Sequence, residues 1–153
     1  ILVWKLKAGQ TVKFLKEVIE LRSIIESEAA RFSAHRATEP EIAHNKKLCQ
    51  LLEEILQDEA RFSYENYLEV DIAFHRAILE ASHNELLAQI GRTMRHAVQT
   101  ARQADIREVE SLLSSQPHHS AVTQAIADKD PQRAYVASRA LFEQVWEHMP
   151  DER

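Results

Sequence analysis

The chain has 153 residues, 44% of them hydrophobic, with only 2 Gly, 4 Pro and 1 Cys. So few turn-forming residues leave little room for the tight connections of a β-sandwich, a β-barrel or a doubly wound sheet, and they favour an all-α fold. No apolar run approaches the roughly 18 residues of a membrane span, and a single cysteine cannot form an internal disulfide, so a cytoplasmic protein without membrane contact is expected.

Charge is distributed unevenly along the chain. Residues 1–16 contain four lysines and no acid, whereas the remainder has 15 basic and 24 acidic residues, a balance of −9 within the total of −5. An acidic body is a poor surface for a phosphate backbone. The chain is therefore not expected to bind nucleic acid by itself.

Residues 1–10 open with an apolar stretch that includes Trp4, which predicts a linker or a short helix. Because the chain starts at Ile1 and no signal sequence follows, we expect a further domain upstream of it. Residues 11–153 are expected to form one all-helical domain, since chains of about 150 residues bury a sizeable core.

Apolar residues at spacings of three and four predict amphipathic helices over residues 11–35, 38–58, 66–81, 84–101 and 131–149. Thr38 and Asn84 are the predicted N-caps of the second and fourth helices. The periodicity weakens over residues 105–116, and Pro117 is expected to end one helix and to start another over residues 118–127. Together these segments predict an antiparallel bundle of about six to seven helices.

Three potential metal ligands are predicted to face the interior of this bundle. Asp71 and His75 are one helical turn apart, on a face with Leu68 and Ile78, and His119 lies on the inward stripe of its own helix. One carboxylate with two imidazoles suits Zn, Ni, Mn or Fe, and three protein ligands leave coordination positions open for water or an organic anion. The alternative is a hydrogen-bonded polar group in the core without a metal.

Three arginines are candidates for binding an anionic effector. Arg22 interrupts the apolar stripe of the first helix, and a buried guanidinium needs a carboxylate or phosphate partner, either an internal acid or a ligand. Arg95 and Arg102 form a basic stripe with Arg92 on the fourth helix, which is either a solvated face or part of an anion site.

Enzymatic activity is not expected from the motifs of the chain. The sequence contains no His-Glu-x-x-His motif, no Gly-rich phosphate loop and no Gly-x-Ser-x-Gly elbow. A metal-dependent enzyme built on Asp71, His75 and His119 is one alternative, but it needs a general base, and no further carboxylate is predicted on an apolar stripe beside these three. A helical dimerisation module without a ligand is another.

The chain resembles a known family in three motifs that occur in the family's order. They are Glu20-Leu21-Arg22-x-x-Ile25-Glu26, then Asp71-Ile72-Ala73-Phe74-His75-Arg76-Ala77-Ile78 with Ala81-Ser82-His83-Asn84-Glu85-Leu86-Leu87, and finally His119-x-Ala121-Val122-x-x-Ala125-Ile126. They are similar to the ligand-binding domain of FadR-subfamily GntR transcription regulators. Val3-Trp4-Lys5-Leu6 resembles the linker that leaves the winged-helix domain in the branch that senses sugar acids such as galactonate.

This resemblance implies a sensor domain of a bacterial transcription regulator. The domain is then an effector-binding and dimerising half that takes a small organic acid or sugar acid, and DNA is bound only by an N-terminal winged-helix domain. Metal-binding members of the family hold the ion with an Asp, a His four residues later, a His in the third motif and a His on the final helix. By this resemblance, Asp71, His75 and His119 correspond to the first three ligands. Leu141 stands where the fourth is expected. Either three ligands hold a divalent ion such as Zn, Ni or Mn, with the effector completing its shell, or the acid binds without a metal.

Overall fold

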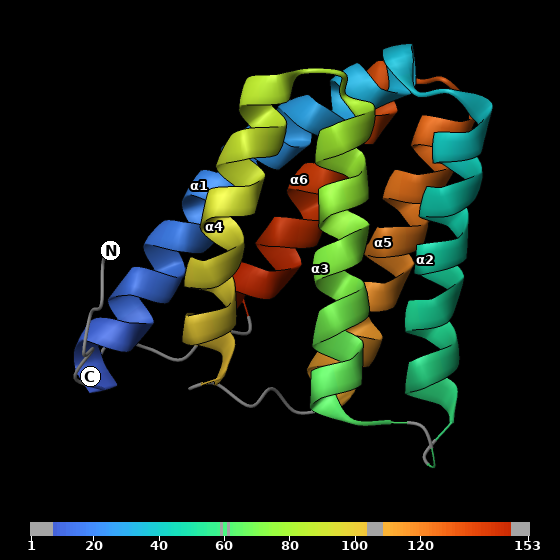
Figure 1. Cartoon of the computed structure of the whole chain (residues 1–153). Helices are drawn as coiled ribbons and strands as arrows, with labels where there is room; N and C mark the ends of the chain where they lie inside the picture. Colours follow the sequence, from blue (N-terminus) through green and yellow to red (C-terminus); the bar gives the residue numbers. More distant parts are fainter. Residues whose placement is uncertain (1–7, 59, 61, 104–108, 148–153) are drawn as a thin grey trace.

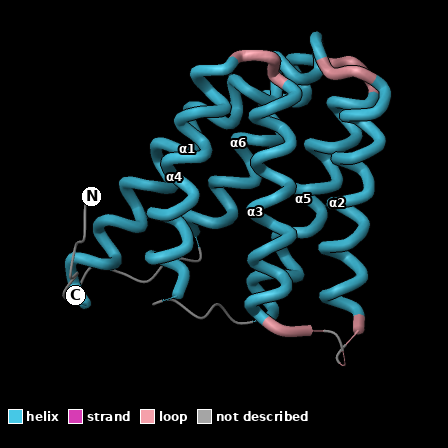
Figure 2. Tube along the Cα trace, viewed as in Figure 1, coloured by secondary structure: helices cyan, strands magenta, loops and turns pink. Residues whose placement is uncertain are grey.

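The computed structural model describes residues 8–58, 60, 62–103 and 109–147, and it confirms the expected all-α bundle. The described residues form six helices and no strand: α1 (Ala8–Arg36), α2 (Glu39–Gln57), α3 (Tyr64–Ala81), α4 (Glu85–Gln103), α5 (Val109–Ala127) and α6 (Pro131–Glu147). Successive helices run up and down the bundle (Figure 1), and the described loops lie at its two ends (Figure 2). Of the linker or short helix predicted over residues 1–10, residues 1–7 lie outside the described residues and residues 8–10 belong to α1.

Three helix starts show how local sequence sets these boundaries. Thr38 precedes α2, and its backbone N–H donates a hydrogen bond to the Glu41 carboxylate at 2.8 Å. The Ser63 hydroxyl caps α3, which begins two residues before the predicted Asn66, by accepting from the Asn66 backbone N–H at 3.1 Å. Asn84 caps α4 as predicted, because its side-chain oxygen accepts from the two backbone N–H groups of Leu86 and Leu87.

The prediction that Pro117 separates two helices is wrong, because α5 runs continuously from Val109 to Ala127 with Pro117 inside it. An interior proline removes one backbone hydrogen bond and costs about 3 kcal/mol or more. Leu112 before it and Val122 after it are both buried in the same hydrophobic core. Packing on both sides of the proline therefore keeps the helix continuous across it, and Pro117 itself is exposed.

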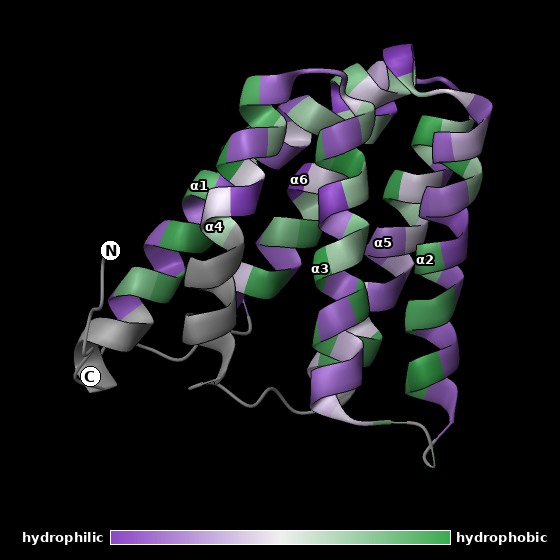
Figure 3. Ribbon diagram, viewed as in Figure 1, coloured by the Kyte–Doolittle hydropathy of each residue, from purple (hydrophilic) through white to green (hydrophobic). Residues whose placement is uncertain are grey.

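The helix α1 packs closely because its inward face is built from small side chains. Ala29, Ala30 and Ala34 have no exposed surface. The Ser33 hydroxyl donates to the Ile78 backbone oxygen on α3 at 2.7 Å, a contact that only a short side chain allows. Figure 3 shows hydrophobic and hydrophilic residues alternating along the helices. This close packing brings the middle of α1 beside the polar residues of α3.

On the surface of the bundle, the apolar side chain of Ile90 on α4 is exposed. Among the described residues, no helix is both long enough and apolar enough to cross a membrane.

Candidate functional site

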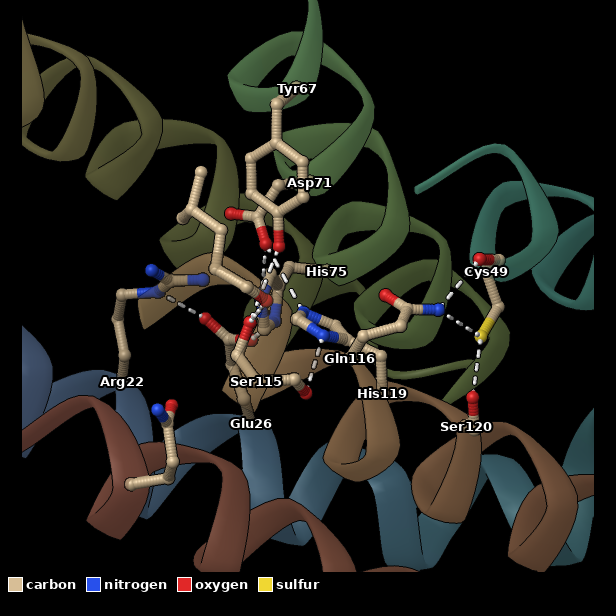
Figure 4. Close-up of polar contacts among 12 residues, drawn as sticks. Arg22, Glu26, Cys49, Tyr67, Asp71, His75, Ser115, Gln116, His119 and Ser120 are labelled. Carbon is tan, nitrogen blue, oxygen red and sulfur yellow. Dashed lines mark hydrogen bonds and ion pairs between the residues drawn. The ribbon is translucent and has the colours of Figure 1, made fainter. Parts of the chain in front are cut away.

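The three residues that sequence reasoning placed on inward faces lie together in the core. Asp71 and His75 come from α3 and His119 from α5, and they are 3%, 6% and 2% exposed. Figure 4 shows the two imidazoles directed at the Asp71 carboxylate. One potential ligand atom from each residue lies within 4.8 Å of the others.

Each imidazole is anchored through Nδ1, which leaves its Nε2 directed at Asp71. His75 Nδ1 lies 2.5 Å from Glu26 Oε2, and His119 Nδ1 lies 3.0 Å from the Ser115 backbone oxygen. A carboxylate and a carbonyl only accept hydrogen bonds, so both Nδ1 atoms carry a proton and donate it. In a neutral ring, Nε2 is then the acceptor, which is the form that binds a metal.

The separations between these acceptor atoms suit a single small cation. Nε2 of His119 lies 3.2 Å from Asp71 Oδ1, and Nε2 of His75 lies 3.6 Å from the same oxygen. Two ligands of a tetrahedral Zn²⁺, each bonded at about 2.0–2.1 Å, lie about 3.3 Å from one another. The donor set and its spacing therefore fit a transition-metal ion.

The electrostatics of the site favour positive charge near Glu26 and His75. Burial raises the pKa of Glu26, but Arg22 and His75 together lower it to about 2. Burial lowers the pKa of His75, yet the negative charges of Glu26 and Asp71 hold it above its usual range. Burial dominates for His119 and lowers its pKa, so this imidazole is neutral at neutral pH and available as a ligand.

Glu26 corrects the expectation that no further carboxylate lies beside the three ligands. It is 4% exposed, and it contacts His75 through one oxygen and Arg22 through the other, at 2.5 and 2.6 Å. The sequence carries a signal for it, because Glu26 is one turn after Arg22 and both interrupt the apolar face of one helix. A residue four positions from a buried arginine is its natural partner.

Arg22 therefore has an internal acidic partner, which is one of the two alternatives for its burial. Its guanidinium is 6% exposed, and it also lies over the Phe142 ring, 5.2 Å from the centroid. Close contacts to a carboxylate and to an aromatic face fix this side chain in the core.

A small cavity lies against the three potential ligands. It has a volume of about 10 Å³, and Tyr67, Leu141 and Phe142 are among the residues that line it. A space of about that size holds one water molecule. Leu141 is 2% exposed in this wall, so the position that the family resemblance assigns to a fourth ligand faces the site with a side chain that cannot coordinate.

A second cavity, of about 30 Å³, lies between α1, α3 and α4. Arg22, Arg76 and Arg92 line it together with Glu26 and His75, and Arg22 and His75 line both cavities. Of these three arginines, Arg76 is the one that was not predicted from the sequence as a candidate for binding an effector. The other two effector candidates, Arg95 and Arg102, belong to α4, but their side chains lie outside the described residues.

Comparison with known proteins gives consistent matches. The FCD domain family matches residues 17–144. The chain is similar to the galactonate operon transcriptional repressor of Escherichia coli, with 29% identity over 90 residues that cover 59% of this chain and 37% of that protein. It is also similar to the Uxu operon transcriptional regulator of Escherichia coli, with 37% identity over 76 residues, 50% of this chain and 28% of that protein. The chain thus spans less than half the length of these relatives.

Solved structures share the fold at lower identity. Streptococcus agalactiae GntR superposes with a TM-score of 0.78 and 20% identity, covering 94% of this chain and 62% of that one. E. coli McbR/YncC superposes with a TM-score of 0.72 and 16% identity, covering 88% of this chain and 63% of that one. Both likenesses support the helical-bundle fold.

Proposed function

Since the chain belongs to the FCD domain family, we propose that it is the effector-sensing domain of a GntR-type transcription regulator. The galactonate and Uxu operon proteins to which it is similar are named as regulators of transcription. In this proposal the domain forms a homodimer, and a winged-helix domain outside residues 1–153 binds DNA. The pairing of two domains then sets the spacing of the half-sites that the regulator recognises.

One observation carries the metal-dependent part of the proposal: two imidazole nitrogens and one carboxylate oxygen converge, while both Nδ1 atoms are held by acceptors. We propose that Asp71, His75 and His119 hold a divalent ion of the Zn, Ni or Mn type. Such an ion supplies a Lewis acid with open coordination positions, to which an oxygen of an organic acid binds. Leu141 leaves one of those positions to the effector.

The effector that this arrangement fits is a small carboxylate or sugar acid. Arg22, Arg76 and Arg92 line the second cavity, where Glu26 offsets the charge of Arg22. His75 lines both cavities, so one molecule in the second cavity can contact arginines and a metal ligand. At about 10 and 30 Å³ the cavities are too small for a sugar acid, so binding requires the helices around them to move apart. The effector then changes DNA affinity only through its preference for the opened arrangement.

Thermal melting tests the metal-dependent part. The chain is treated with a chelator and then given Zn²⁺, Ni²⁺ or Mn²⁺, alongside Asp71→Ala, His75→Ala and a control, His44→Ala, which removes an exposed histidine of α2. Metal at 100 times its Kd stabilises by about 2.7 kcal/mol, or about 5–11 °C for a domain of this size. We expect this rise in the parent and in the control only. No rise in the parent with any of the ions contradicts metal binding.

Effector binding is tested on the metal-loaded chain with a panel of sugar acids that includes galactonate. We expect a further rise in Tm with at least one acid, a smaller rise for Arg92→Ala, and recovery of the acid unchanged. Conversion of the acid would instead support the metal-dependent enzyme.

A further inference from the structure

We propose that Glu26 is the positioning residue of the metal centre, which holds the His75 ring with Nε2 directed at the ion. The inference rests on the proposed metal binding by Asp71, His75 and His119. It assigns to α1 a part in a site whose ligands come from α3 and α5.

The geometry around Glu26 leaves it this role rather than that of a ligand. Both of its oxygens are engaged, with Arg22 Nε at 2.6 Å and His75 Nδ1 at 2.5 Å. Among the described residues, the group of converging ligand atoms consists of Asp71, His75 and His119. Glu26 therefore lies behind the His75 ring, on the side away from Asp71, as Figure 4 shows.

The two imidazoles are held by different anchors. His119 donates to the Ser115 backbone oxygen of its own helix, and any residue at position 115 has such an oxygen. His75 donates to a side chain of another helix, so the orientation of its ring depends on residue 26. The Phe74 and Phe142 rings also lie near the His75 ring, at centroid distances of 5.4 and 5.7 Å, and neither accepts a strong hydrogen bond.

Arg22 fixes Glu26 in turn. The two residues are one turn apart on α1 and their side chains are almost completely buried, so the carboxylate has little freedom to leave His75. A carboxylate behind a metal-bound imidazole fixes the tautomer and makes the ring a stronger ligand, and its loss typically weakens metal binding by 10–100-fold. With Leu141 in place of a fourth ligand, the affinity of the site depends strongly on how well the three remaining ligands are oriented.

Titration with Co²⁺ tests the proposal, because the visible absorption of Co²⁺ reports the ligands and affinity follows from competition with a chelator. The variants are Glu26→Leu, which removes the acceptor, and Glu26→Gln, which keeps an acceptor without the charge. Glu28→Gln is the matched control, since Glu28 lies two residues away in a half-exposed ion pair with Arg31. We expect about 10–100-fold weaker binding for Glu26→Leu, a smaller loss for Glu26→Gln and parental binding for the control.

The outcomes separate this proposal from the one on which it rests. No Co²⁺ binding by the parent overturns the metal site itself. Parental affinity and an unchanged spectrum in folded Glu26→Leu overturn only the role of Glu26, because a residue needed solely for folding lowers Tm without changing the affinity of the folded fraction.

A measurement on the parent covers the case in which the Glu26 variants do not fold. In Zn²⁺-loaded protein with ¹⁵N-labelled histidine, we expect His75 to be protonated at Nδ1 and metal-bound at Nε2. The His75 signal is assigned by its absence from the spectrum of His75→Gln. Metal binding through Nδ1 overturns the proposal.

Discussion

Replacing Leu141 by histidine is expected to strengthen metal binding while it weakens the metal-free fold. Leu141 is 2% exposed and lines the cavity at Asp71, His75 and His119, so an imidazole there faces the three ligands. Without a metal, the new ring is buried away from water, and a buried polar group left without a partner costs about 1–3 kcal/mol. For a domain of this size, that lowers Tm by about 2–12 °C.

With a metal, the new ring supplies a fourth ligand and closes the coordination shell. Each tenfold gain in affinity adds about 1.4 kcal/mol at saturating metal, or about 3–6 °C, to the roughly 5–11 °C expected of the parent. Tm is measured for Leu141→His and the parent, each with a chelator and with Zn²⁺. Leu141→Gln, polar but a poor Zn²⁺ ligand, is the control for the cost of burial.

The difference between the metal-bound and metal-free Tm is the decisive quantity. We expect it to be larger in Leu141→His than in the parent, and in Leu141→Gln no larger than in the parent. A smaller difference in Leu141→His would show that position 141 does not face the ion, and it would contradict the placement of the metal between the three ligands.

Three further predictions concern the fold. Asn84→Ala removes the cap of α4 and should lower stability by about 1 kcal/mol, or about 2–4 °C in Tm, and an unchanged Tm would show that the start of α4 contributes nothing to stability. Pro117→Ala restores a backbone N–H inside α5 and should raise stability in urea unfolding by about 1–2 kcal/mol, part of the gain being offset by the more flexible unfolded chain. A loss of stability would show that the proline itself is needed for the packing of α5. The pKa of Glu26 is lowered to about 2, so its contribution to stability is full above about pH 4.5 and is lost as the pH falls towards 2. Acid unfolding should therefore be shallower in Glu26→Gln, and parallel curves would contradict the pairing of Glu26 with Arg22 and His75.

Local signals predicted much of the fold. The caps at Thr38 and Asn84 lie where the sequence places them, because a capping residue acts on backbone groups within three positions of itself. Pro117 shows where such reasoning fails. Its local preference is to break a helix, and burial of residues on both sides of it, a property of the whole bundle, prevails.

The site was predictable to the extent that its residues share a helix face. Asp71 and His75 are one turn apart, and His119 interrupts an apolar stripe, so their inward orientation follows from periodicity. The contact between Glu26 and His75 joins α1 to α3 and depends on how these helices pack, which periodicity does not specify. The same reason explains why the small volume of the cavities, and the position of Arg76 in one of them, became known only from the structure.

Under the proposed function, the small cavity beside Asp71, His75 and His119 has a kinetic consequence for effector binding. A site with room for one water cannot admit a sugar acid by collision with the closed bundle, so entry waits for the helices to separate. The observed rate of association should then rise with acid concentration and level off at the rate of opening, instead of increasing without limit. Any substitution that loosens the packing around Leu141 and Phe142 should raise that ceiling, and a regulator built on such a domain responds at a speed set by its own core.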